Sequence, residues 1–496
     1  MKKNATIVVA LSLSILMGRE TGADSRGIEH GLRYDRLIIR NVVVVDGKGT
    51  PARGPVDIVI HGNSIDSIRR TRSDDEAYRD EAQILDGTGL TLLPGLINMH
   101  AHIHDRRGGG TLPEDYIYKL WLGCGITTVR DCGSNYDRTV EDRRKSREGL
   151  IVAPRILLYM ITRGRTTEEI RQKVRDIKAA GGDGVKIVGH DRDLIEALID
   201  EAKKQGLRVA HHIGVEETDA WDDAEFGVTT IEHWYGIPDA ALHGSQNFPS
   251  WYNYSNEGDR FRYAGRLWRE ADPDKLEAVL RKMVDSGVAW NTTFVAYENN
   301  RDIVRAKNLP WFEDYLHPLL EEHFRPDPRV HGSYNWNWTT TDEVFWRENY
   351  KLWMKAARDF AGMGGLVCVG EDSGYSFNLY GFGVLRELEL HHEAGFHPID
   401  VIQHATGNNA RVLGMDDRLG RIRDGYLADM ILVDGNPLEN LKYLYPRGIL
   451  DLYEMQGGDM VVKGGIQWTI KDGFVYHAPT LLDDVKTMVA EARQTR

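Results

Sequence analysis

The stretch Pro94-Gly95-Leu96-Ile97-Asn98-Met99-His100-Ala101-His102 decides how this chain is interpreted. Its apolar run predicts a short strand that ends in two histidines. Side chains two residues apart in a strand point to the same face, so both imidazoles can reach one metal ion. His104 continues the alternation just past the strand and is a third candidate ligand. Such pairs also arise by chance, so a metal site needs support from elsewhere in the chain.

Beyond this strand, apolar runs alternate with segments of helical spacing such as 167–180 and 194–205. This alternation indicates parallel βα units. The apolar runs number eight: 96–99, 126–129, 155–158, 185–188, 208–210, 229–231, 288–291 and 366–369. We therefore predict an α/β fold with a (β/α)8 TIM barrel over residues 94–414.

Both ends of the chain show short β-branched runs broken by turn residues, which are typical of antiparallel strands. We expect residues 24–93 and 415–475 to combine into one small β-sandwich domain, followed by a C-terminal helix over 476–496. The barrel carries an aromatic-rich insert around residues 243–343, and its tryptophans are Trp311, Trp336, Trp338 and Trp346. Such a cluster suits either a lid over an apolar substrate or a dimer surface.

The first residues differ from the rest of the chain. Lys2 and Lys3 precede an apolar run over 5–18, and small residues follow at 21–23. This pattern predicts a secretory signal peptide over 1–23, and hence a periplasmic or secreted protein. An uncleaved anchor and a disordered tail are the weaker interpretations. After cleavage we expect no membrane association.

The composition narrows the class of function. The formal net charge is −13, and it is spread along the chain without a basic stripe, which argues against nucleic-acid binding. Cys124, Cys132 and Cys368 form no CxxC pair, so neither a disulfide framework nor a cysteine zinc site is indicated. A small molecule or short peptide is the expected partner, and a homo-oligomer is compatible with the sequence.

Four polar residues lie where later barrel strands are expected to end, at the face where barrel enzymes keep their catalytic groups. Lys186 interrupts the apolar run 184–188, His211 and His233 each end a run, and Asp372 follows the last one. Singly, each has an ordinary interpretation: an exposed lysine, a core histidine or a helix cap. All four at successive strand ends, behind a His-x-His pair, point to a metal site.

This order of residues resembles the amidohydrolase superfamily. The tail Ala405-Thr406-Gly407-Asn408-Asn409-Ala410-Arg411-Val412-Leu413-Gly414 and the segment 420–430 strengthen the resemblance. Within the superfamily, the chain is most similar to the imidazolonepropionase-related branch with its prolidase-like zinc dipeptidases and carboxypeptidases. One departure is Asn98, where the family usually has Asp; that residue is not a ligand there.

The resemblance implies two divalent metal ions, with zinc as the expected metal, although manganese, cobalt or iron would also accept these ligands. His100, His102 and Asp372 would hold one ion, and His211 and His233 the other. Lys186 would bridge them as a carbamate, because burial favours the neutral amine that captures carbon dioxide. Counting back from Gly214 selects His211, which leaves His212 pointing away.

The implied reaction is hydrolysis of an amide or peptide C–N bond, in a dipeptide or an N-acyl amino acid. A hydroxide bridging the two metals would attack the carbonyl, and Asp372 would pass its proton to the leaving nitrogen. Tyr235 resembles the residue that contacts the substrate carboxylate in this branch. The alternatives are a hydrolase or deaminase of cyclic C–N bonds with one ion and, from a different class, a non-catalytic barrel scaffold.

Overall fold

The computed structural model describes residues 28–71, 82–104, 106–214, 218–243, 257–327, 338–448, 453–456 and 459–495. The expected signal peptide lies outside these residues. Among the described helices, none combines the length and apolar character needed to cross a membrane.

Eight parallel strands form the central sheet, each paired with the next along the chain. They are β7 (Leu96–Ala101), β10 (Ile126–Cys132), β11 (Arg155–Ile161), β12 (Gly184–Val188), β13 (Arg208–His212), β14 (Thr230–Glu232), β15 (Ala289–Asn291) and β16 (Val367–Cys368). Two backbone hydrogen bonds join its edges, from Met99 N to Val369 O (3.0 Å) and from Asp372 N to His100 O (2.9 Å). The sheet therefore closes on itself, as the predicted TIM barrel requires.

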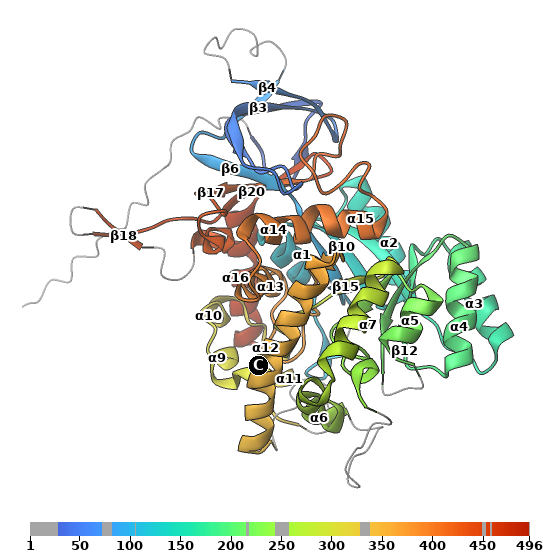
Figure 1. The fold of residues 1–496 in the computed structure, drawn as a ribbon. Helices are drawn as coiled ribbons and strands as arrows, with labels where there is room; N and C mark the ends of the chain where they lie inside the picture. Colours follow the sequence, from blue (N-terminus) through green and yellow to red (C-terminus); the bar gives the residue numbers. More distant parts are fainter. Residues whose placement is uncertain are drawn as a thin grey trace, which may run out of the picture.

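Helices surround this barrel and are visible in Figure 1. They are α1 (Glu114–Gly123), α2 (Tyr136–Glu148), α3 (Thr167–Ala179), α4 (Arg192–Lys204), α5 (Ala220–Phe226), α7 (Pro273–Asp285), α12 (Thr340–Gly362), α13 (Phe382–Glu393), α14 (Pro398–Gln403) and α15 (Asn409–Leu413). Their apolar faces share one core with outward residues of the strands, such as Val185 and Ile187 of β12. Burial of this amphipathic pattern holds the helices on the barrel.

A second sheet combines both ends of the chain, and Figure 1 shows its blue N-terminal strands beside the red C-terminal ones. Its order is β1 (Leu32–Arg33), β21 (Phe474–His477), β20 (Ile466–Lys471), β17 (Met430–Asp434), β6 (Leu90–Pro94), β2 (Arg36–Val44), β3 (Arg53–His61) and β4 (Ser64–Arg70), and β5 (Gln83–Asp86) also pairs with β2. The hydrogen bonds make it one sheet of nine strands, folded over a core that includes Leu37, Ile58 and Met430. After it, α16 (Ala478–Gln494) packs against α1.

The aromatic-rich insert forms two groups of helices around β15. Between β14 and β15 lies α6 (Glu257–Glu270), which packs against α12. After β15 come η3 (Phe294–Tyr297), α8 (Glu298–Arg301), α9 (Ile303–Lys307), α10 (Phe312–Tyr315) and α11 (Pro318–His323). Two hairpins lie outside both sheets, β8 (Arg106–Arg107) with β9 (Gly110–Thr111), and β18 (Tyr453–Gln456) with β19 (Asp459–Val462). The remaining described elements are the short helices η2 (Asp239–Ala241), η5 (His404–Asn408), η6 (Leu441–Leu444) and η7 (Pro446–Gly448).

Candidate metal centre

Three predicted ligands meet where β7 and β16 end. His102 Nε2 lies 3.2 Å from Asp372 Oδ1, and His100 Nε2 lies 3.8 Å from the same oxygen. The ligand atoms of these residues all lie within 4.8 Å of one another, close enough to bind one ion. The fold thus brings the two histidines of the opening strand to a carboxylate that is some 270 residues away in the chain.

His233 and Lys186 extend this cluster across the barrel mouth. His233 Nε2 lies 3.8 Å from Asp372 Oδ2, and it is buried without a hydrogen-bond partner. Lys186 is 2% exposed, and its Nζ lies 3.4 Å from His100 Nε2. A buried ring nitrogen without a partner costs free energy unless a ligand satisfies it. The nitrogen of His233 is therefore in the position expected of a metal ligand.

His211 contacts a surrounding helix through Nδ1. His211 Nδ1 lies 2.8 Å from Oδ1 of Asp223, a residue of the surrounding helix α5. The ring of His212 lies instead 4.8 Å from that of His233 and 4.7 Å from that of Tyr235. The interpretation that His212 points away from the site is therefore corrected.

The register between β12 and β13 explains why His212, rather than His211, lies beside His233. Lys186 pairs with Ala210, and Val188 pairs with His212. Paired residues of parallel strands point to the same side and alternate along each strand, so His212 faces inward with Lys186 while His211 faces the helices. Counting back from Gly214 ignored this alternation.

The outer nitrogen of His100 is held by a buried acid that the sequence analysis did not single out. His100 Nδ1 lies 2.7 Å from Glu232 Oε2, and Arg130 Nη2 donates to Glu232 Oε1 at 2.5 Å. Arg130 holds the pKa of the Glu232 carboxyl well below its usual range, although burial acts to raise it. An ionised Glu232 can only accept, so His100 donates from Nδ1 and leaves the Nε2 lone pair facing Asp372. The available signal was an acid inside the apolar run before His233.

The site favours neutral imidazoles and an ionised carboxylate. Burial, followed by the charge of Lys186, lowers the pKa of His100 to about 4. Burial also lowers the pKa of His233 well below its usual value. Burial would raise the pKa of Asp372, but the imidazoles of His100, His102 and His233 bring it well below its ordinary value. Neutral imidazoles with a carboxylate are the donor set that suits zinc.

The backbone is strained where three of the strands end. His233, Thr293 and Asp372 have positive φ angles of 65°, 47° and 49°. Residues with a side chain rarely adopt this conformation. A strained residue persists only where neighbouring contacts hold it, and such residues cluster at functional sites. The strain therefore marks the same edge of the barrel as the polar cluster.

Tyr235 lies beside the cluster and is almost fully buried. Its ring centroid is 5.9 Å from that of His233 and 6.1 Å from that of Tyr297 in η3. Tyr297 in turn stacks on Phe261 and on Trp346 of the insert. The insert thus reaches the candidate ligand His233 through a series of contacting aromatic rings.

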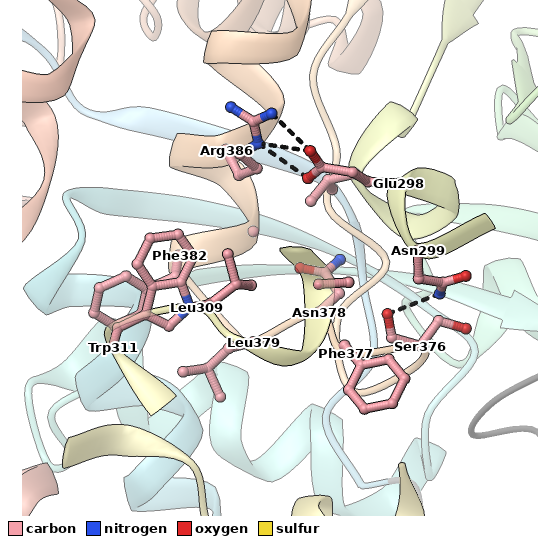
Figure 2. Close-up of a pocket in the computed structure, with 13 residues that line it drawn as sticks. Glu298, Asn299, Leu309, Trp311, Ser376, Phe377, Asn378, Leu379, Phe382 and Arg386 are labelled. Carbon is pink, nitrogen blue, oxygen red and sulfur yellow. Dashed lines mark hydrogen bonds and ion pairs between the residues drawn. The ribbon is translucent and has the colours of Figure 1, made fainter. Parts of the chain in front are cut away.

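The tryptophans of the insert occupy different positions. Trp311 and Trp346 are buried within the chain, at 4% and 2% exposure, which argues against a dimer surface built on them. Trp338 is partly buried and stacks on Trp346; Trp336 lies outside the described residues. Figure 2 shows Trp311 in a pocket with Phe377 and Leu379, which belong to the loop after Asp372.

His104 belongs to a separate cluster. Its Nε2 lies 3.2 Å from Asp142 Oδ2 and 3.6 Å from Glu114 Oε1, while Arg138 contacts Glu114. His104 Nδ1 lies 3.2 Å from Thr139 Oγ1. This third candidate ligand is therefore engaged away from Asp372.

Comparison with known proteins identifies a family that this chain matches. A model described as the Amidohydrolase family matches residues 91–244 and 354–467, which together exceed half of the chain. The gap between them covers most of the aromatic insert. A dihydroorotase from Thermus aquaticus is 37% identical over 84 residues, so the chain spans only 17% of that relative's length.

Solved structures share the architecture. A Xaa-Pro dipeptidase with bound methionine superimposes with a TM-score of 0.61 at 20% identity, over 89% of this chain and all of that one. Ochratoxinase from A. niger gives 0.60 at 16% identity, over 90% and 96%. At these identities the likeness establishes the fold alone.

Proposed function

Since the chain belongs to the amidohydrolase family, a family of hydrolytic enzymes, we propose that it is a metal-dependent hydrolase of the amide bond in a dipeptide or N-acyl amino acid. The observation that carries the proposal is the convergence of His100, His102 and His233 on Asp372, with Lys186 buried beside them. A non-catalytic scaffold would have no need to keep such a costly polar cluster buried.

We assign the ligands of two divalent ions, expected to be zinc, from this arrangement. His100, His102 and Asp372 would hold the first ion. His233 and the inward-facing His212 would hold the second, and a carbamate on Lys186 would bridge the two. The buried Nε2 of His233 supports this assignment, because a cation would satisfy it. Bound there, the metals would polarise a carbonyl and make a water acidic enough to react near neutral pH.

The chain's own groups would then handle the proton. Asp372 is the group with the low pKa at the centre of the cluster, and its side chain is still 16% exposed. It can accept a proton from the attacking water and deliver it to the leaving nitrogen. Glu232 and Asp223 lie behind His100 and His211, and they orient rings without reaching the reaction centre.

Substrate recognition is the finer part of the proposal. Tyr235 would contact the substrate carboxylate, since its ring lies against His212 and His233. Aromatic rings at this side, including Tyr297, suit an apolar side chain. The similarity of fold to a Xaa-Pro dipeptidase supports a peptide-like substrate. Hydrolysis of a cyclic C–N bond is the second candidate, because of the local sequence match to a dihydroorotase.

A substrate panel tests the proposal. Zinc-reconstituted protein is assayed for release of amino acids from dipeptides, N-acyl amino acids and cyclic amides, with Asp372→Asn as the control. We expect cleavage of linear amides by the wild type and a loss of at least ~100-fold in the variant. Equal activity in the two proteins would reject the mechanism, and cleavage of cyclic amides alone would select the second candidate.

A further inference from the structure

We propose that Glu387 of α13 is a positioning residue for the metal centre: it holds the loop 292–295 so that Thr293 fixes the ring of His233. The inference rests on the metal site of the proposed function. It adds a residue of a surrounding helix, which reaches His233 through this loop.

Thr293 determines which nitrogen of His233 faces the site. His233 Nδ1 lies 2.5 Å from Thr293 Oγ1, and the Thr293 hydroxyl donates to Thr292 O at 2.8 Å. A hydroxyl has one proton to give, so at His233 it must accept. His233 therefore carries its proton on Nδ1, and its Nε2 lone pair faces Asp372.

The conformation of Thr293 needs support. Its φ of 47° and ψ of 44° lie in the left-handed region, where a β-branched residue is strained. Such a conformation persists only when neighbouring contacts hold it. The loop must consequently be fixed on the side away from His233.

Glu387 provides that support with both carboxylate oxygens. Its Oε1 accepts the backbone N–H of Phe294 at 2.9 Å and the hydroxyl of Thr292 at 2.8 Å. Its Oε2 accepts the backbone N–H of Val295 at 2.7 Å. One side chain thus bonds to the residues on both sides of Thr293, which fixes the turn.

The burial of Glu387 supports this positioning role. Its side chain is fully buried, and His391 Nε2 lies 3.2 Å from Oε1. Beyond it, His391 Nδ1 lies 3.0 Å from His404 Nδ1. Burial of a carboxylate is costly and becomes tolerable only with full hydrogen bonding. An uncharged side chain would cost less free energy to bury at this position. The buried carboxylate therefore indicates that this loop must be placed accurately.

The test compares Glu387→Gln with Glu389→Gln, a change two residues along the same helix. Glu389 accepts hydrogen bonds from Arg386 and Tyr445 instead of from the loop residues that Glu387 holds. In Glu387→Gln the amide N–H2 group would face a backbone N–H, so the loop would shift. We expect zinc affinity, measured by chelator competition, to fall about 10–100-fold for one of two ions, as for other outer partners of ligands. The Glu389 control should keep wild-type affinity.

A merely structural role would give a different result. Glu387→Gln would then lower the melting temperature while both zinc affinities stayed at the wild-type value, and that outcome overturns the proposal. If this variant does not fold, Thr293→Val and Thr293→Ser decide. Val keeps the shape and loses the acceptor, so its zinc affinity should fall, while Ser restores the acceptor and should rescue affinity. Equal affinity in the two variants also overturns the proposal.

Failure here is distinguishable from failure of the proposed function. Wild-type protein that binds two ions yet cleaves nothing in the panel would refute the function while the affinity differences remain. Active wild type with unchanged affinity in the Glu387 and Thr293 variants would refute the positioning role alone.

Discussion

At the scale of single residues, the site depends on which ring nitrogen each histidine presents. His100 and His233 donate from Nδ1 to Glu232 and Thr293, which leaves Nε2 of each ring pointing at Asp372. The partner on the far side of a ring therefore prepares the near side for a cation. These partners come from β14 and from the loop after β15, so each lies far in the sequence from the histidine that it orients.

Substitutions of His211 and His212 test which of the two side chains faces the interior of the barrel. We expect His212→Asn to reduce zinc binding from two ions to about one, because the inward ring is lost. His211→Asn should keep both ions and lower the melting temperature, because Asp223 loses its buried partner. Metal content of the purified, reconstituted variants is the measurement. The reverse pattern would return the ligand assignment to His211.

The apolar runs predicted the strands of the barrel, and the strand count in turn set where the candidate site residues were expected. His100, His102, Lys186, His233 and Asp372 were each expected at a strand end, and the structure places them together. His211 was also expected at a strand end as a ligand, but its ring contacts Asp223 of α5. A run such as 208–212 does not reveal the register with the neighbouring strand that decides which way the side chain points. Glu232, Arg130 and Glu387 were missed because their roles depend on contacts across the barrel that only the fold creates.

At the scale of elements, the closure of the barrel places Asp372. The segment after β16 bonds to β7 through Asp372 N and His100 O, and Gly370 lies within this segment. A Cβ on Gly370 would lie 2.9 Å from His100 N and 2.8 Å from Asn291 Nδ2. The absence of a side chain therefore lets the last strand reach the first.

Gly370→Ala should consequently disturb both stability and metal binding. We expect a loss of about 1–3 kcal/mol in the free energy of unfolding, as for overpacked cores, together with weaker zinc binding. Gly362→Ala is the matched control, because nothing lies within 4 Å of its Cβ. Urea denaturation and chelator competition measure the two effects. Identical curves for the two variants would contradict the close approach.

At the scale of the whole molecule, the nine-stranded sheet is tied to the barrel by buried charges. Arg155 of β11 donates to both oxygens of Asp429, at 2.7 and 3.0 Å, and to Asp472 at 3.3 Å. Lys471 of β20 donates to Ser146 O at 2.6 Å. The sequence predicted that the chain ends would combine, because their β-branched runs share one texture. It could not predict these ties, which join residues about 270–330 positions apart.

Asp429→Ala should loosen this junction. Removing one partner leaves the buried Arg155 guanidinium poorly compensated, at a cost of about 3 kcal/mol. Denaturation followed by tryptophan fluorescence and by circular dichroism should show a lower midpoint. Glu148→Ala, which removes an exposed partner of Arg144, should leave the midpoint nearly unchanged. An equal shift in both would argue against the buried tie.

Lys471 makes the stability of the junction between the sheet and the barrel depend on pH. Burial lowers its pKa to about 8, from an ordinary value of 10.5. Between these values the unfolded chain binds more protons than the folded one, so stability rises with pH. Relative to Lys471→Met, the wild type should gain about 3 kcal/mol between pH 8 and 10.5. A constant difference between the two proteins across this range would refute the shift.

The bridging role that we propose for Lys186 between two metal ions is tested by metal stoichiometry. Zinc per chain is measured by inductively coupled plasma mass spectrometry on reconstituted wild type and Lys186→Ala. We expect two ions in the wild type and about one in the variant. One ion in both proteins would contradict it.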